Sequence, residues 1–267
     1  MSKLYGIAAS ATVPVRKENK DASEMVTQLL LGEAFEVITI HERWVELRCY
    51  HDGYEGWVNR NQVRFMDESE LNNWMQNPKL KRSPYAAFRV MADREALLVP
   101  LGAQIIFHEH GIQIVEKRYN YIYPPIELKE DHLLQTAISL LGIPYMWGGR
   151  SDLGIDCSGF IQLVYQLHGY LPPRDASQQL DRSVAKPIQG EDIISHAEEG
   201  DIIFIGPDSE KITHIGFYLG EGTLLHASGN VRLDNLSYKM RYQNKHPYNE
   251  RLAGRVQFVQ KGTSLMK

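Results

Sequence analysis

Cys157 lies where a glycine-rich loop changes into a predicted helix, a place that suits a catalytic nucleophile. Counted from this cysteine, apolar residues recur at the i, i+3, i+4 and i+7 spacing of a buried helix face, namely Phe160, Ile161 and Val164. We therefore expect the thiol in the first turn of a helix, where the helix dipole favours the thiolate over the thiol. The alternative is a small buried side chain, the usual role of a free cysteine.

Two histidines, His214 and His226, lie on consecutive predicted strands. The strands are Ile212–Leu219 and Thr223–Ser228, and Gly220-Glu221-Gly222 predicts a hairpin between them. A three-residue loop pairs Leu219 with Thr223. In that register His226 lies opposite Gly216, which leaves room for it, and the two histidines are diagonal neighbours on one face.

This arrangement has a chemical use, because one imidazole can take the proton of Cys157 while the second orients it and fixes its tautomer. The alternative is a pair of histidines that hydrogen-bond to backbone groups. One cysteine with two histidines can also bind zinc, but no local pair of ligands at i, i+3 or i, i+4 and no Cys-x-x-Cys motif supports it. We expect nucleophilic catalysis by Cys157 with His214 and His226, without a metal or cofactor.

The chain has 267 residues, enough for two or three domains. Residues 1–77 contain short alternating runs separated by turn signals, which is typical of a small β-barrel. A connecting helix is expected from Asp67 to Asn77, before Pro78. Cys49 falls on a predicted strand of this barrel, where we expect it to pack in the core.

Residues 78–126 contain further short predicted strands and fit a second, more degenerate barrel. His108 and His110 would share one face of a strand, as metal ligands do, but no third ligand lies near them, and a solvated turn is the better interpretation. The aromatic, proline-rich run from Tyr119 to Pro125 predicts a linker to the next domain.

Residues 127–267 form the third predicted domain, which carries Cys157 and both histidines. The pattern predicts a helix capped by Asp131, then the helix that begins at Cys157, and a buried strand over Gly200–Ile205 ahead of the hairpin. Helices and antiparallel strands together indicate the α+β fold class.

The composition is that of a globular protein, with 43% hydrophobic and 23% charged residues and a formal net charge of -4. This charge favours neither nucleic acid nor an anionic membrane as a partner. Two cysteines in different predicted domains make a disulfide framework improbable. The start of the chain lacks the apolar run of a signal peptide, so a soluble cytoplasmic protein is expected, or a periplasmic one if a leader has been removed.

The order of motifs in the third domain resembles the NlpC family of papain-like cell-wall cysteine peptidases. The motifs are Tyr145-x-Trp147-Gly148-Gly149, Asp156-Cys157-Ser158-Gly159-Phe160, Arg174-Asp175-Ala176-Ser177-Gln178, Gly200-Asp201-Ile202, Thr213-His214-Ile215-Gly216 and Leu225-His226-Ala227-Ser228. The first domain resembles a bacterial SH3-like domain through Leu31-Gly32-Glu33 and Gly53-Tyr54-Glu55-Gly56-Trp57-Val58. The whole chain is similar to γ-D-glutamyl-L-diamino acid endopeptidases of the dipeptidyl-peptidase VI type.

The resemblance implies that Cys157 is the nucleophile, that His214 is its base and that His226 orients His214. It implies that the Tyr145 hydroxyl helps to hold the oxyanion. It also implies a set of substrate contacts, namely Asp156, Ser158, Asp175 and Ser177 in the third domain and Glu33, Tyr54 and Glu55 in the first, which would close one side of the cleft. Ala176 stands where the family often has serine.

Enzymes of this type cut the bond between D-Glu and the diamino acid of murein stem peptides that carry a free N-terminal L-Ala. A free α-amino group is a cation near neutral pH, so Asp156 and a carboxylate of the first domain would pair with it. The expected partner is therefore a murein stem peptide, and a monomer is expected. Two alternatives stay open: a catalytically inactive cell-wall-binding protein, and a Cys-His amidase or acyltransferase on the same fold.

Overall fold

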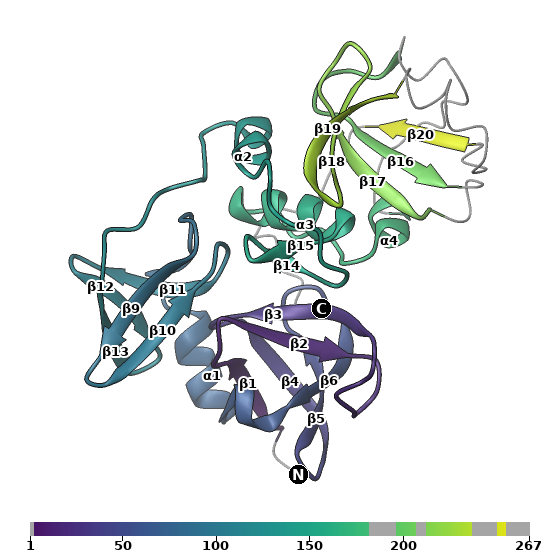
Figure 1. Ribbon diagram of the computed structural model, residues 1–267. Coiled ribbons are helices and arrows are strands. Elements are labelled where there is room, and N and C mark those ends of the chain that lie inside the picture. Colours follow the sequence, from purple (N-terminus) through teal and green to yellow (C-terminus); the bar gives the residue numbers. More distant parts are fainter. Residues whose placement is uncertain (1–2, 182–195, 207–211, 237–249, 255–267) are drawn as a thin grey trace. The chain divides into compact units, whose positions relative to one another are not determined.

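The computed structural model describes residues 3–181, 196–206, 212–236 and 250–254, and it divides the chain into two compact units (Figure 1). The first unit comprises residues 1–129 together with 147–153, and the second comprises residues 130–146 together with 154–267. Within the described ranges, no helix combines the length and apolar character needed to cross a membrane.

The N-terminal barrel is a seven-stranded antiparallel sheet in the described part of the chain, with strand order β3-β2-β6-β5-β4-β1-β7. Its strands are β1 (Tyr5–Ala8), β2 (Thr12–Arg16), β3 (Met25–Leu30), β4 (Ala34–His41), β5 (Trp44–Cys49), β6 (Glu55–Asn59) and β7 (Val63–Met66), with a 3-10 turn η1 (Arg60–Gln62). Side chains alternate across the sheet, so Val13 and Val15 of β2 are buried between half-buried neighbours. Cys49 is 1% exposed and packs in this core, as predicted.

The predicted connecting helix is confirmed as α1 (Glu68–Met75). Asp67 caps it, because its carboxylate accepts a hydrogen bond from the Glu70 N–H while the Glu70 carboxylate accepts one from the Asp67 N–H. Leu71 and Trp74 form the buried face of this helix. Their burial fixes α1 against the barrels.

A second antiparallel sheet follows, with strand order β10-β9-β13-β12-β11-β8. Its strands are β8 (Leu80–Arg82), β9 (Phe88–Ala92), β10 (Glu95–Val99), β11 (Gln104–His108), β12 (Gly111–Ile114) and β13 (Lys117–Tyr121). The predicted linker from Tyr119 is wrong at its start, since β13 pairs with both β9 and β12 and Tyr119 is only 7% exposed. The two prolines that follow, Pro124 and Pro125, indicate a linker, whereas the alternation of tyrosines with polar residues over 117–121 indicates a strand.

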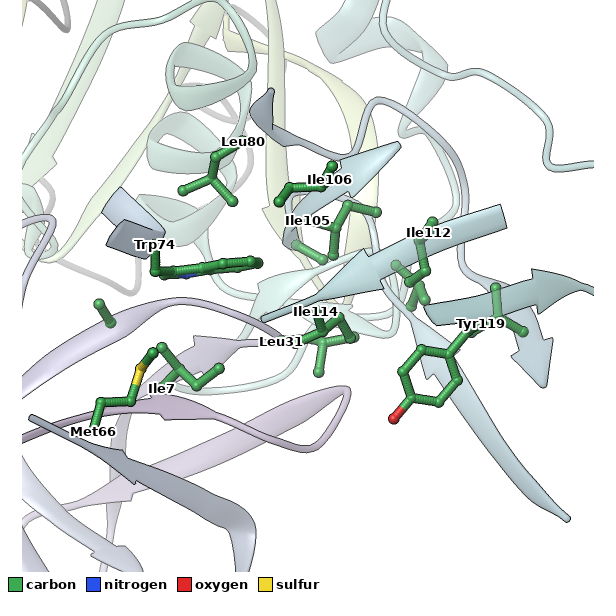
Figure 2. Close-up of a cluster of buried hydrophobic side chains, with 14 of the residues drawn as sticks. Ile7, Leu31, Met66, Trp74, Leu80, Ile105, Ile106, Ile112, Ile114 and Tyr119 are labelled. Atoms are coloured by element: carbon green, nitrogen blue, oxygen red, sulfur yellow. The ribbon is translucent and has the colours of Figure 1, made fainter. Parts of the chain in front are cut away.

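One hydrophobic core joins the two barrels, and Figure 2 shows its side chains. Ile7, Leu31 and Met66 of the first barrel and Trp74 of α1 belong to the same cluster as Leu80, Ile105, Ile106, Ile112, Ile114 and Tyr119 of the second segment. Trp74 also donates its Nε1–H to the Gly32 carbonyl at 3.0 Å. Because full burial of one such apolar side chain contributes about 1.5–3 kcal/mol, this shared core makes the two barrels one body.

The second unit contains the helices α2 (Leu133–Ser139), α3 (Cys157–Leu167) and α4 (Ala176–Asp181) and a sheet with strand order β19-β18-β17-β16-β20. The strands of this sheet are β16 (Ile202–Gly206), β17 (His214–Tyr218), β18 (Thr223–Ser228), β19 (Asn230–Asn235) and β20 (Glu250–Gly254). The short strand β15 (Gly154–Ile155) lies directly ahead of α3, whereas the short strand β14 (Arg150–Ser151) belongs to the residues that group with the first unit. The predicted cap Asp131 is wrong: α2 begins after His132, whose backbone is extended, and no side chain caps this end. The α+β class is confirmed.

Every residue of α3 is buried, so the helix is enclosed on all sides and not only along the predicted face. Phe160 packs edge-on against Phe217 of β17, with ring centroids 5.5 Å apart. Tyr165 stacks on the same phenylalanine at 6.0 Å. This packing fixes the first residue of α3 relative to the strand that carries His214.

Candidate active site

Cys157 opens α3, as predicted. The carboxylate of Asp156 caps the helix by accepting a hydrogen bond from the Gly159 N–H at 2.7 Å. Backbone groups of Ser158 and Ile215 hydrogen-bond to the Cys157 thiol. Since Ile215 directly follows His214, this hydrogen bond places the nucleophile at the start of the strand that carries its predicted base.

The net pKa of the Cys157 thiol is raised, although the backbone hydrogen bond from Ser158 at the helix start lowers it. Cys157 is 9% exposed, and burial raises its pKa to about 12, with a further increase caused by the Asp156 carboxylate. Arg174 and the two backbone hydrogen bonds act in the opposite direction. The expectation of a thiolate favoured by the helix dipole is therefore wrong, and the thiol needs a base to remove its proton.

The two histidines face each other across the β17–β18 hairpin. The expected register is confirmed, with Phe217 opposite Leu225. Nε2 of His214 lies 2.6 Å from Nδ1 of His226, and the ring planes make an angle of 79°. Gly216 permits this approach, because a Cβ at that position would lie 2.8 Å from Cβ of His226. The contact with His226 thereby fixes the ring of His214 at its Nε2 atom.

Asp234 on β19 extends the histidine pair. Its Oδ2 lies 2.7 Å from Nε2 of His226 and 3.0 Å from Nη2 of Arg232. His226 is 2% exposed, and the side chain of Asp234 is 19% exposed, so the contact is partly buried. Neither Asp234 nor Arg232 is predicted as a site residue from the sequence, because the strand after Ser228 is not identified there. The alternation of apolar and polar residues over 230–235 is the signal that indicates it.

Tyr145 is held beside the thiol by its backbone. Its N–H donates a hydrogen bond to the Gly229 carbonyl at 2.9 Å, and it forms a β-bridge with Ile155. Burial, followed by the charges of Cys157 and Asp156, raises the pKa of Tyr145 to about 12. The phenol therefore keeps its proton near neutral pH and can donate a hydrogen bond to an oxyanion.

Arg174 joins Asp156 and Ser158, the two predicted substrate contacts beside the nucleophile. Its Nη2 and Nη1 lie 2.5 and 3.0 Å from the two carboxylate oxygens of Asp156, and Nη1 lies 2.8 Å from Oγ of Ser158. All three residues are buried. A bidentate guanidinium fixes the direction of both side chains. The sequence places Arg174 in a family motif but does not indicate this ion pair.

The other two predicted contacts of this domain lie at the start of α4. Asp175 is half-buried and Ser177 is exposed. Gln179 ties α4 to α3, because its Nε2 donates hydrogen bonds to the carbonyls of Ser158 at 3.1 Å and Pro173 at 2.9 Å. The structure thus brings α4 to the site, and the contacts of Asp175 and Ser177 with substrate stay predictions.

The predicted contacts of the first domain lie in the first unit, in three different surroundings. Tyr54 packs half-buried against the barrel core, and Glu55 is exposed and pairs with Arg48 at 2.6 Å. Glu33 is 1% exposed and begins a buried ionic cluster. Their contacts with substrate stay predictions.

Two arginines compensate the negative charge of Glu33. Its carboxylate lies 2.8 Å from Nη1 of Arg150 and 2.7 Å from Nη1 of Arg82. Burial alone would raise its pKa, but Arg150, His51 and Arg82 together hold it below the ordinary value. Glu33 is therefore ionised in the interior of the first unit.

Residues 147–153 group with the barrels, although the sequence assigned them to the third domain. The guanidinium of Arg150 also donates to the carbonyl of Gln28 at 2.7 Å. Asp152 accepts hydrogen bonds from the N–H groups of Ala87 and Leu101 at 2.5 and 3.0 Å. Both barrels therefore hold this loop, which lies only a few residues ahead of Cys157 in the chain.

A buried thiol at the start of a core helix, a histidine pair on the facing hairpin and a tyrosine hydroxyl beside them define a papain-like cysteine peptidase. Residues 142–251 match the NlpC/P60 family, and residues 15–63 match the bacterial dipeptidyl-peptidase Sh3 domain. The chain therefore carries an NlpC/P60 peptidase domain behind an SH3 domain of the bacterial dipeptidyl-peptidase kind, as the sequence predicts.

The chain is similar to proteins of the same architecture. A gamma-D-glutamyl-L-lysine dipeptidyl-peptidase of Bacillus cereus is 26% identical over 84% of this chain and 73% of its own length. A dipeptidyl-peptidase 6 of Lysinibacillus sphaericus is 29% identical over 77% and 81%. A crystal structure of an NlpC/P60 family protein from Bacillus cereus has a TM-score of 0.74 at 18% identity, over 94% of this chain and 99% of the other, which shows the same fold.

Proposed function

We propose that the protein is a γ-D-glutamyl-L-diamino acid endopeptidase that acts on murein stem peptides with a free N-terminal L-Ala. The contact of His214 with His226 at 2.6 Å, at the start of the strand whose backbone holds the Cys157 thiol, carries the catalytic part of the proposal. The names of the relatives from Bacillus cereus and Lysinibacillus sphaericus support the dipeptidyl-peptidase specificity.

In the reaction, His214 removes the proton of Cys157 as the sulfur attacks the γ-carbonyl carbon of D-Glu. The carbonyl oxygen becomes an oxyanion, which the Tyr145 hydroxyl stabilises by donating a hydrogen bond. When the tetrahedral intermediate collapses, the C–N bond breaks and His214 gives its proton to the leaving α-amine of the diamino acid. His214 then deprotonates a water molecule, which attacks the thioester. The C–S bond breaks, the dipeptide L-Ala-D-Glu leaves, and His214 returns its proton to the sulfur.

Recognition of the free N-terminus follows from charge. The substrate ammonium needs a carboxylate partner when it leaves water, and Asp156 and Asp175 are the acidic residues at the start of α3 and α4. Arg174 already pairs with Asp156, so it holds this carboxylate in one direction for the incoming ammonium. An N-acetylated peptide has no such charge and is expected to be rejected.

The test is hydrolysis of L-Ala-γ-D-Glu-L-Lys, followed by mass spectrometry, with the meso-diaminopimelate peptide in parallel. The lysine in the name of the Bacillus cereus relative makes the lysine peptide the first substrate to test. We expect release of L-Ala-D-Glu and the free diamino acid. Cys157→Ala should abolish turnover, while Cys49→Ala, which alters the buried thiol of the first barrel, should keep it.

Two further peptides test the specificity. The α-linked isomer, with the same composition, should not be cut, because the attacked carbonyl is then displaced by two methylene groups. The N-acetyl peptide should not be cut either. Equal cleavage of free and acetylated peptides would refute the free N-terminus requirement, and binding of murein without any hydrolysis would favour an inactive wall-binding protein.

A further inference from the structure

We propose that Asp234 is a positioning residue of the catalytic centre, which acts on His214 through His226. The proposal rests on the cysteine peptidase activity proposed above and adds a positioning residue behind its pair of histidines. The observation behind it is a continuous line of short contacts: Oδ2 of Asp234 to Nε2 of His226 at 2.7 Å, and Nδ1 of His226 to Nε2 of His214 at 2.6 Å.

The strand register places these side chains on one face. In the β18–β19 pair, Leu224 lies opposite Asp234 and His226 lies opposite Arg232. Asp234 is therefore the diagonal neighbour of His226, just as His214 is on the other side. Three adjacent strands thus each contribute one polar side chain to the line.

The order of donors along the line follows from elementary rules. An ionised carboxylate only accepts hydrogen bonds, so Nε2 of His226 must carry the proton that faces Asp234. In a neutral ring the other nitrogen, Nδ1, is then an acceptor, and Nε2 of His214 must donate to it. The proton of His214 is thereby placed on Nε2, and the lone pair of its Nδ1 is the one that can accept the thiol proton.

The negative charge of Asp234 also favours proton transfer from Cys157 to His214. When His214 takes the proton of Cys157 it becomes a cation, and the carboxylate of Asp234 stabilises this cation through the His226 ring. Arg232 reduces that effect, since its Nη2 and Nε lie 3.0 and 3.2 Å from the same oxygen. Among the described residues of this centre, Asp156 and Arg174 shift the pKa of the thiol, and the thiol in turn raises the pKa of Tyr145.

The first test needs no substrate. Nitrogen-15 NMR of the histidine side chains distinguishes a protonated from an unprotonated ring nitrogen. In the wild-type protein near neutral pH we expect protons on Nε2 of both His226 and His214. In Asp234→Ala the preference is lost and His226 is expected to populate the opposite tautomer. An unchanged tautomer in this variant would overturn the proposal, whatever the enzyme hydrolyses.

The second test is kinetic and uses L-Ala-γ-D-Glu-L-Lys. Asp234→Ala should lower kcat by about 10- to 100-fold, by analogy with the loss of a partner that orients a metal-binding imidazole, with KM changed less than about 2-fold because substrate binding is not altered. The acidic limb of the kcat/KM profile should move to lower pH, since a negative charge near the imidazolium is gone. Asp234→Asn, whose amide oxygen can still accept the His226 proton, should recover part of kcat but not the position of the acidic limb.

Two further variants, Arg232→Ala and Glu221→Gln, complete the kinetic test. Arg232→Ala leaves Asp234 without its cation, so the acidic limb should move to higher pH, opposite to Asp234→Ala. Glu221→Gln removes an exposed negative charge from the turn of the same hairpin and should leave kcat and the profile unchanged. A fall in kcat with no displacement of the limb in either Asp234 variant would show a purely structural role and overturn the proposal. Absence of hydrolysis by the wild-type protein would instead refute the proposed function and leave the NMR test standing.

Discussion

Arg174 holds the carboxylate of Asp156 with two guanidinium nitrogens, at 2.5 and 3.0 Å, directly beside the nucleophile in the chain. The pair is buried, and Asp156 is one of the groups that raise the pKa of Cys157 while Arg174 lowers it. Arg174 therefore has two effects at once: it compensates a buried charge and it limits the cost of forming the thiolate.

Replacement of Arg174 should impair both stability and activity. Arg174→Met leaves the Asp156 carboxylate buried without its cation, which costs about 3–5 kcal/mol of unfolding free energy. Arg174→Lys keeps a charge but not the fork geometry, so we expect an intermediate loss and a kcat/KM at least about tenfold below wild type. Urea unfolding and peptide hydrolysis measure the two effects, and a fully active Arg174→Lys variant would contradict the positioning role.

The parts of the site that could be predicted are those that depend on local sequence. Helix periodicity after Cys157 and the three-residue loop between Leu219 and Thr223 determine where the thiol and the two histidines lie, because helix phase and hairpin register are set by neighbours in the chain. The direction of the Cys157 pKa was predicted wrongly, since it depends on burial by distant segments.

The parts that could not be predicted depend on contacts between distant segments. Asp234 joins the site only through a third strand, and the Arg150–Glu33 pair links residues 117 positions apart. Sequence spacing carries no information about which arginine neutralises a given buried carboxylate. For the same reason, the packing of residues 147–153 with the barrels could not be predicted.

Glu33 and Glu55 provide a matched comparison in the first unit. Glu33→Gln leaves the buried Arg150 and Arg82 without their shared anion and should cost about 3–5 kcal/mol of unfolding free energy. Glu55→Gln breaks an exposed pair with Arg48, whose two side chains are 49% and 52% exposed, and should cost less than about 1 kcal/mol. Equal stabilities of the two variants in chemical denaturation would contradict the structural role of the buried cluster.

The unfolding free energy should fall as the pH rises above about 9. The pKa of Cys157 is raised from 9.0 to about 12, so the unfolded thiol loses its proton before the folded one does. Each such cysteine lowers the unfolding free energy by up to about 1.4 kcal/mol per pH unit in this window, and Cys49, whose pKa is also raised by burial, acts in the same direction.

Cys157→Ala removes one of the two contributions, so the slope of stability against pH between pH 9 and 10 should be smaller in the variant than in the wild-type protein. Urea unfolding at pH 8, 9 and 10 measures this slope. The prediction fails if the two slopes are the same within error, because the Cys157 thiol would then titrate alike in the folded and unfolded chains.

Gly216→Ala tests the close approach on which the histidine pair depends. A Cβ at this position would lie 2.8 Å from Cβ of His226 and 2.9 Å from the carbonyl oxygen of Leu225, and a backbone atom cannot move aside as a side-chain end can. The two strands must therefore separate, at a cost of about 1–3 kcal/mol for overpacking. A displacement of about 1 Å at His226 would release His214 and lower kcat by up to about 100-fold. Thr223→Ala, at the other end of β18, serves as the control and should keep kcat; a Gly216→Ala variant with wild-type kcat would show that the spacing of β17 and β18 does not set the geometry of the catalytic base.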